Sequence, residues 1–409
     1  MQNHLSYRWP AGPSIHAPTP PQRPQRRLGR AGRIALLVLG CAAALAGLIL
    51  AAFWGMMFLA DRLISAQQPT SPLPSSSISR PQEEDWSPEQ LPQGDPDPEA
   101  ELTLSQDSQQ VLTPQEIYQS VLPSVVCVQA RRGQVYNVGS GVIASADGYI
   151  ITNYHILQGG TDISVMLLSN QLTYDAVLVG CDEELDLAVL KVEAPNLTPA
   201  RLADSDQLQV GDQVYAIGNP MGYLYGTMTE GIVSSLAREV EVSDHDMTLI
   251  QTSAALNSGN SGGALVDVYG QVVGITSAKI TGVSDDVVTE GIGLAIPITD
   301  SLPFLNHIIQ TGETCRPALG VMCSIYTIGN RQRVVITEVT PGSPSQGLLF
   351  PDDEVVAVNG RQVDTFYQLS RALNAAGVGG TVELTVLRDG QEVAVSVTLY
   401  DSLTAGTGS

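Results

Sequence analysis

The sequence predicts a mainly β protein in which antiparallel barrels are followed by a smaller α+β unit and preceded by a membrane-spanning helix. Between residues 124 and 298, short runs rich in β-branched residues alternate with turn signals. Strands at this spacing, with few helical patterns between them, are typical of antiparallel barrels. A shorter set of alternating runs with one helical pattern extends from residue 315 to 400. The third observation is an uncharged span close to the N-terminus.

This uncharged span has the length of a membrane anchor. Residues 34–60 contain no charged side chain, and a helix needs about 20 apolar residues to cross a bilayer. The apolar core of a cleaved signal peptide has only about 7–15 residues, so we predict an uncleaved anchor. Residues 1–33, rich in Pro and Arg, are predicted to be a disordered basic tail on the cytoplasmic side. Everything after residue 60 is then extracytoplasmic.

The formal net charge of −22 is unevenly distributed along the chain. Six arginines lie in residues 1–33, and 14 basic residues accompany 42 acidic ones after Arg33. Because nucleic acid is bound by basic surfaces, we expect no nucleic acid partner. Residues 61–112 are rich in Pro, Ser, Gln and acidic side chains, whose self-repulsion predicts an extended linker.

The cysteines form no Cys-x-x-Cys pair, so we expect neither a metal site nor a thioredoxin-like motif. Four of them lie outside the uncharged span. The sequence leaves open whether these four form one or two disulfides or are buried free thiols. The five residues are Cys41, Cys127, Cys181, Cys315 and Cys323.

Two folded units are predicted after the linker, over residues 113–312 and 313–402, with a tail at 403–409. The first begins with a short helix at Thr113 and ends in a helical rhythm over residues 301–310. In the second, Asp364 is expected to cap a helix that Gly377 ends. One face of that helix carries Phe366, Leu369 and Leu373.

The stretch from Asn257 to Gly263 sets Ser261 among three glycines, directly before a strand-like run. Glycine is needed where the backbone takes a positive φ or approaches a bound group. Such a turn exposes the Ser261 Oγ and aims the N–H groups of Gly259 and Ser261, together with that of Asn260, at one point. That geometry is required of an oxyanion hole. For these residues alone, an ordinary Gly-rich turn is the alternative.

A nucleophilic serine needs a base that a third group holds in place. Three histidines follow the predicted anchor. His155 ends an apolar strand and is the best candidate, whereas His245 lies in an acidic loop and His307 on a predicted helix. Asp186 heads an apolar run and is the candidate orienting acid; a turn or cap residue is the alternative. With Ser261, these residues predict a Ser-His-Asp triad.

Five motifs resemble the HtrA/Deg family of trypsin-like serine proteases. They occur in the family's order: residues 139–143, 147–155, 186–191, 216–220 and 259–263. Residues 318–321 and 342–344 resemble its PDZ domain. The plan of one anchor, one protease domain and one PDZ domain is similar to DegS and to membrane-anchored HtrA proteins of Gram-positive bacteria.

The resemblance implies two six-stranded β-barrels with the catalytic residues His155, Asp186 and Ser261 between them. It also implies a homotrimer in the cell envelope that cleaves unfolded or misfolded proteins without a cofactor. The specificity pocket would be formed by residues 256–258 and 276–280 and the loop up to Glu290, and would favour small or medium apolar side chains.

The resemblance further implies two regulatory features. The PDZ domain would bind apolar C-termini by strand addition, with the Leu319–Val321 loop (Leu319, Gly320, Val321) at the carboxylate and Phe366, Leu369 and Leu373 near the groove. Packing inside the domain is the alternative for these three side chains. Arg238 matches a family arginine whose loop contacts the oxyanion loop upon activation; a surface arginine is the alternative.

Two departures from the family pattern leave the triad untouched. Ser253 replaces an acidic residue, and Ser258 replaces a proline. Loss of the proline frees φ at residue 258, which favours an oxyanion loop that is disordered until triggered. The rival hypothesis is a proteolytically idle, peptide-binding chaperone or scaffold; a damaged triad would favour it, but all three residues are present.

Overall fold

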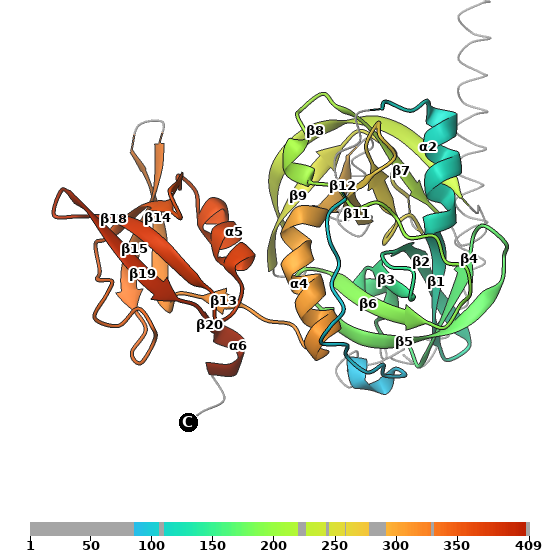
Figure 1. The fold of residues 1–409 in the computed structure, drawn as a ribbon, viewed down its shortest axis with the longest axis horizontal. Helices are drawn as coiled ribbons and strands as arrows, with labels where there is room; N and C mark the ends of the chain where they lie inside the picture. Colours follow the sequence, from blue (N-terminus) through green and yellow to red (C-terminus); the bar gives the residue numbers. More distant parts are fainter. Residues whose placement is uncertain are drawn as a thin grey trace, which may run out of the picture. The chain divides into compact units, whose positions relative to one another are not determined.

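The computed structural model describes residues 86–105, 110–219, 226–242, 245–257, 259–277, 292–328 and 331–405 (Figure 1). The described residues all fall within one compact unit of the chain, residues 82–409. The predicted tail and anchor, residues 1–60, lie outside the described residues. Within the described ranges, no helix has both the length and the apolar character needed to span a membrane.

Six antiparallel strands close into a first barrel in the order β1-β2-β3-β6-β5-β4. Side chains with no exposed surface fill it, among them Val126, Ile150 and Leu190. The strands are β1 (Val125–Arg132), β2 (Val135–Ile143), β3 (Tyr149–Thr152), β4 (Asp162–Leu167), β5 (Thr173–Asp182) and β6 (Leu187–Val192).

A second barrel closes in the order β10-β11-β12-β9-β8-β7, which confirms the prediction of antiparallel barrels. Val214, Ile250 and Leu265, at most 1% exposed, pack together in its interior. The strands are β7 (Gln213–Gly218), β8 (Thr227–Val242), β9 (His245–Thr252), β10 (Ala264–Val266), β11 (Val272–Ser277) and β12 (Gly293–Pro297).

Short helices flank the barrels. A capping box begins α2 (Pro114–Val121), because Thr113 Oγ1 accepts from Glu116 N while Glu116 Oε2 accepts from Thr113 N. Gly312, at φ 79°, ends α4 (Ile298–Thr311), the predicted bridging helix. The other short helices of the described protease region are η2 (Pro88–Gln90), η3 (Leu122–Ser124), α3 (Tyr154–Leu157) and η4 (Ser205–Gln207).

The C-terminal unit is a sheet in the order β14-β15-β16-β18-β19, packed with the helix α5 (Phe366–Ala376). Thr365 rather than the predicted Asp364 caps this helix, because Thr365 Oγ1 accepts from Gln368 N in a capping box. The strands are β13 (Pro317–Ala318), β14 (Val321–Ile328), β15 (Arg331–Val339), β16 (Glu354–Val358), β17 (Arg361–Gln362), β18 (Thr381–Arg388), β19 (Gln391–Thr398) and β20 (Tyr400–Asp401), followed by α6 (Ser402–Ala405).

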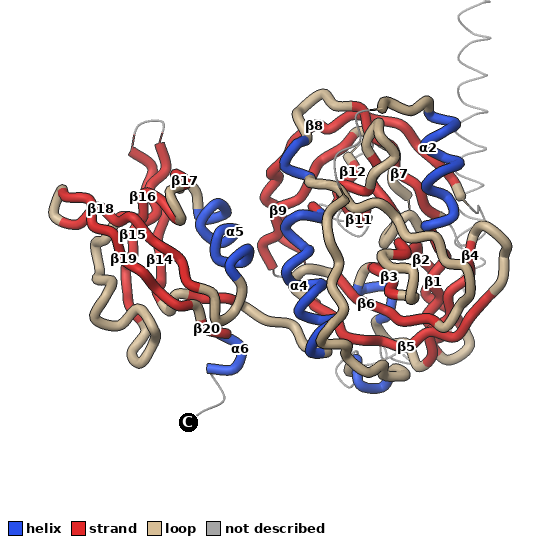
Figure 2. The backbone as a smooth tube through the Cα atoms, viewed as in Figure 1, coloured by secondary structure: helices blue, strands red, loops and turns tan. Residues whose placement is uncertain are grey.

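Residues 86–105, here called the strap, pack against the barrels and run beside α4 (Figure 2). Gly94 N donates to Leu178 O at 2.8 Å, and Leu102 N donates to Asn306 Oδ1 at 2.7 Å. Leu91 is 3% exposed and Leu102 5%. The prediction of an extended linker up to residue 112 is therefore wrong for the strap. Its few apolar residues each enter a core, and its backbone finds partners on the folded domain.

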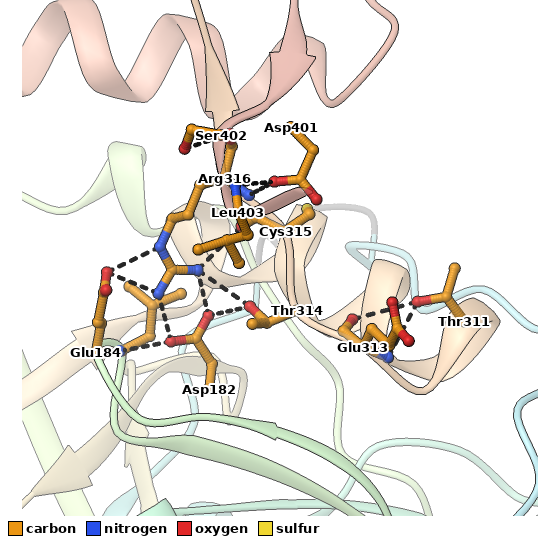
Figure 3. Close-up of polar contacts among 11 residues, drawn as sticks. Asp182, Glu184, Thr311, Glu313, Thr314, Cys315, Arg316, Asp401, Ser402 and Leu403 are labelled. Atoms are coloured by element: carbon orange, nitrogen blue, oxygen red, sulfur yellow. Dashed lines mark hydrogen bonds and ion pairs between the residues drawn. The ribbon is translucent and has the colours of Figure 1, made fainter. Parts of the chain in front are cut away.

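The segment after α4 docks on the first barrel through Arg316 (Figure 3). Its guanidinium forms a fork with the buried carboxylate of Asp182, with Nη2 to Oδ1 at 2.7 Å, and its Nε donates to Glu184 at 2.9 Å. Thr314 Oγ1 also donates to Asp182. Burial acts to raise the pKa of Asp182, but the hydrogen bonds and charge of Arg316 outweigh it and lower the pKa below its ordinary value.

Replacing Asp182 by Asn is expected to lower the free energy of unfolding by about 2 kcal/mol at pH 7, because Arg316 loses a charged partner. Since the folded pKa lies below the unfolded value of about 3.9, this stabilisation is complete above about pH 4 and is lost as the pH falls further. Denaturant unfolding of both proteins between pH 7 and 3 measures the difference. The control Glu354→Gln, at the more exposed pair with Arg333, should cost at most about 1 kcal/mol. A difference between wild type and Asp182→Asn that does not shrink in acid would contradict the assignment.

Candidate active site

The structure brings His155 and Asp186 into contact, as the sequence predicted. His155 Nδ1 lies 2.8 Å from Asp186 Oδ2 and 2.9 Å from Oδ1. The backbone N of His155 also donates to Asp186 Oδ1, at 3.0 Å. A carboxylate at Nδ1 holds the proton there and leaves Nε2 as the accepting nitrogen. Asp186 is 5% exposed, as befits an orienting group shielded from water.

Asp186 has a left-handed backbone, with φ at 51°. This conformation costs an ordinary residue roughly 1–2 kcal/mol and persists only where its surroundings determine it. The Asp186 carbonyl accepts from Tyr154 N at 3.2 Å and from the Asn153 side chain at 2.8 Å. The turn before β6 is thereby fastened to the start of α3, the helix that carries His155.

Ser261 lies in the turn before β10, and glycine is required on its C-terminal side. Gly262 has φ at 80°, and a Cβ there would lie 2.1 Å from Ser140 O. The carbonyl of Ser261 accepts from Ser140 N at 2.7 Å, so the first barrel holds the serine turn of the second. Gly139 lies beside both this carbonyl and Ile156 of α3. The serine turn and the histidine helix therefore border the same glycine.

Strand β11 connects the serine turn with the acid. Thr276 accepts from Gly262 N at 2.8 Å through its carbonyl and donates to Asn260 O at 2.6 Å through its hydroxyl. The next residue, Ser277, donates to Asp186 Oδ2 at 3.2 Å. Thr276 thus binds the serine turn of the second barrel, and Ser277 binds Asp186 of the first. The candidate site therefore lies between the barrels.

The predicted oxyanion donors differ in their bonding. Asn260 N donates to Asn257 O at 3.0 Å, so this N–H group belongs to the turn and does not face a substrate oxygen. Gly259 has φ at 98°, a conformation that glycine adopts readily. The N–H groups of Gly259 and Ser261 stay the predicted donors, whereas the inclusion of Asn260 is corrected, because its N–H group is bonded within the turn.

Ser140 is a residue to which the sequence analysis assigned no role. Its hydroxyl donates to Gly259 O at 2.7 Å and accepts from Asn219 N at 2.9 Å. Its carbonyl accepts from the Thr152 hydroxyl at 2.7 Å, and its side chain is fully buried. The only signal in the sequence was its position in the Gly139-Ser140-Gly141 motif, which predicts a strand but not a contact with residue 259.

The other candidate histidines lie elsewhere. His245 begins β9, and His307 is half-buried on α4. Arg238 lies exposed on β8, where its Nε donates to Gln251 Oε1 at 2.9 Å. Most of the predicted specificity loop, residues 278–290, and residue 258 lie outside the described residues.

The described cysteines are free, which decides between the two alternatives that the sequence left open for them. Burial raises the pKa of the Cys181 thiol to about 12 and that of Cys323 to about 11. These thiols stay protonated at neutral pH and are poor nucleophiles. In the described parts of the chain, no three potential ligand side chains come together in a way that could hold a metal ion.

The predicted peptide-binding residues of the C-terminal unit fall into two groups. Leu319, Leu369 and Leu373 are at most 8% exposed and belong to its core, so packing accounts for them. Phe366 is 51% exposed at the start of α5. Gly320, at φ 77°, leads into Val321 and the edge strand β14. An edge strand offers unpaired backbone groups to an added strand.

Two closed barrels with the candidate residues Ser261, His155 and Asp186 between them have the architecture of trypsin-like serine peptidases. In agreement, residues 139–275 match the trypsin-like peptidase domain family, and residues 317–399 match the PDZ domain family. The chain is 37% identical over 286 residues to the serine protease Do-like HtrA of Lactobacillus helveticus, covering 65% of this chain and 69% of that protein. The chain belongs to the HtrA/DegP family of serine proteases.

Further relatives agree with this family. The probable periplasmic serine endoprotease DegP-like of Chlamydia muridarum is 37% identical over 271 residues, 64% of this chain. The chain spans only 53% of that relative's length. The solved structure of the HtrA-type protease AlgW with a tripeptide has a TM-score of 0.59 at 32% identity, over 71% of this chain and 97% of that one.

Proposed function

We propose that the chain is a membrane-anchored, ATP-independent serine endopeptidase that cleaves unfolded or misfolded proteins in the bacterial cell envelope. The observation that carries the proposal is the contact of His155 with Asp186, 2.8 Å from Nδ1 to Oδ2. Strand β11 binds both this aspartate and the turn that holds Ser261. Relatives named periplasmic serine endoproteases support an extracytoplasmic site of action. The uncharged span of residues 34–60 supports the anchor, with the N-terminus cytoplasmic.

In the proposed reaction, Ser261 Oγ attacks the scissile carbonyl while His155 Nε2 takes its proton and later returns it to the leaving amine. Asp186 keeps Nδ1 protonated and stabilises the imidazolium that forms. The N–H groups of Gly259 and Ser261 stabilise the oxyanion, and loss of one such donor typically costs about 10²–10³-fold in rate.

The PDZ domain is proposed to sense apolar C-terminal peptides by adding them to β14, with Gly320 and Val321 at the peptide carboxylate and Phe366 at the groove. A neighbour solved with a tripeptide and another with a decapeptide support peptide binding. Peptide binding would act on the protease through an order–disorder transition of the oxyanion loop, in which Arg238 takes part. We further propose a homotrimer of protease domains, on the resemblance alone.

The experiment compares the full-length chain with its Ser261→Ala variant on unfolded casein, with and without hydrophobic C-terminal peptides. We expect cleavage that the variant lacks and that the peptides raise. Binding of casein without cleavage by either protein would instead support a chaperone or scaffold. Equal cleavage by both proteins would exclude Ser261 as the nucleophile.

A further inference from the structure

The strap reaches the helix that carries His155. Its first residue, Trp86, donates from Nε1 to Gly160 O at 2.8 Å. The Trp86 ring lies 6.2 Å from the ring of Tyr154, centroid to centroid, and is tilted by 47° to it. Tyr154 precedes His155 in α3. A segment far from the triad in the sequence therefore contacts the neighbour of the candidate base.

Helix α3 is too short to be stable by itself. It has four residues and no side-chain cap, and a helix of one turn is unstable unless packing holds it. On one side, Asp186 accepts from the backbone N atoms of Tyr154 and His155. At the other end of α3, Gly160 follows the helix and its N donates to Leu157 O.

The strap covers this second end. Trp86 binds the Gly160 carbonyl, and a Cβ on Gly160 would lie 3.3 Å from Leu91 Cδ2. Leu91 is buried in the same apolar cluster as Ile156 and Leu157 of α3, and Trp86 packs against that cluster. Besides its packing on β1 and β2, the helix is thus held at one end by Asp186 and at the other by the strap.

We propose that Trp86 is a positioning residue for His155, through which the strap sets the orientation of the imidazole toward Ser261. The proposal rests on the proposed triad. Catalysis depends steeply on the placement of the base, since a displacement of about 1 Å can cost about 10²-fold in rate.

The test measures kcat and KM for unfolded casein with the full-length chain and four variants. Trp86→Ala is expected to lower kcat about tenfold with KM unchanged, because the ring contact and the hydrogen bond are both lost. Trp86→Phe, which keeps a ring against Tyr154, should recover kcat to within about threefold of wild type. Leu102→Ala is the matched control, because it removes a buried side chain from the same strap where the strap lies against α4. It should lower the melting temperature and leave kcat within about twofold.

Ser261→Ala, the fourth variant, separates failure of this proposal from failure of the proposed function. If Ser261→Ala is inactive and Trp86→Ala loses no more kcat than Leu102→Ala, Trp86 is only a structural residue and the proposal is overturned. A Trp86→Phe variant as slow as Trp86→Ala would also overturn the role of the ring. If Ser261→Ala cleaves as fast as wild type, the triad fails, and the positioning role fails with it.

Discussion

Replacing Asp186 by Asn is expected to lower kcat about 10⁴-fold while leaving the fold intact. The Asp186 carboxylate accepts from His155 Nδ1, from the backbone N of His155 and from the Ser277 hydroxyl. An Asn side chain has the same shape but only one accepting oxygen. Its NH2 group either faces one of these donors or donates to His155 Nδ1, and in the second case the imidazole must take the wrong tautomer. The base then carries its proton on Nε2, the nitrogen that is proposed to accept the proton of Ser261. Steady-state cleavage of casein, together with the melting temperature, measures the effect.

The matched control for this prediction is Asp147→Asn. Asp147 lies at the opposite end of β3 from His155, where its carboxylate, 56% exposed, pairs with Lys191. Loss of that surface pair should change kcat by less than twofold and the free energy of unfolding by at most about 1 kcal/mol. An Asp186→Asn enzyme within tenfold of wild type would show that another group orients the base.

Replacing Ser140 by Ala is expected to lower kcat by about 10- to 100-fold with little change in KM. The hydroxyl of Ser140 joins Gly259 O and Asn219 N inside the protein. Without it, a buried carbonyl and a buried N–H lose their partner, at a cost of about 1–3 kcal/mol. The cost falls on the turn whose Gly259 N–H group is proposed to stabilise the oxyanion, so we expect it to raise the free energy of the transition state. The ratio of kcat for the two proteins, with KM measured alongside, tests this.

Ser301→Ala provides the comparison for Ser140→Ala. Ser301 is 2% exposed on α4, and its hydroxyl donates to Pro297 O at the same 2.7 Å that separates Ser140 from Gly259. Both variants remove one buried hydrogen bond to a carbonyl, but only Ser140 touches the serine turn. Equal kcat values for the two variants would assign Ser140 to stability alone.

The residues of the candidate triad could be predicted because each has a local signature in the sequence. The positive φ of Gly262 is a property of the turn that holds Ser261, and glycine adopts it readily, although the Ser140 carbonyl that a Cβ there would meet comes from the other barrel. His155 and Asp186 each adjoin a short apolar strand, and antiparallel pairing of β3 with β6 brings those strand ends together. The free cysteines and the exposure of Phe366 were left open, because burial depends on neighbours from distant strands.

By itself, the pattern of the sequence determined antiparallel barrels followed by a smaller α+β unit, since period-two patterning and turn signals are properties of short segments. The resemblance of its motifs to the family added the number of barrels and the PDZ domain, and the triad stays a prediction. Only the tertiary structure decided that the strap is folded, that Ser140 holds the serine turn and that Leu369 and Leu373 belong to the core. An acidic, Pro-rich segment such as the strap carries no periodic signal. Leu91 and Leu102 order it only because the finished barrels and α4 offer each of them an apolar site, together with partners for its backbone.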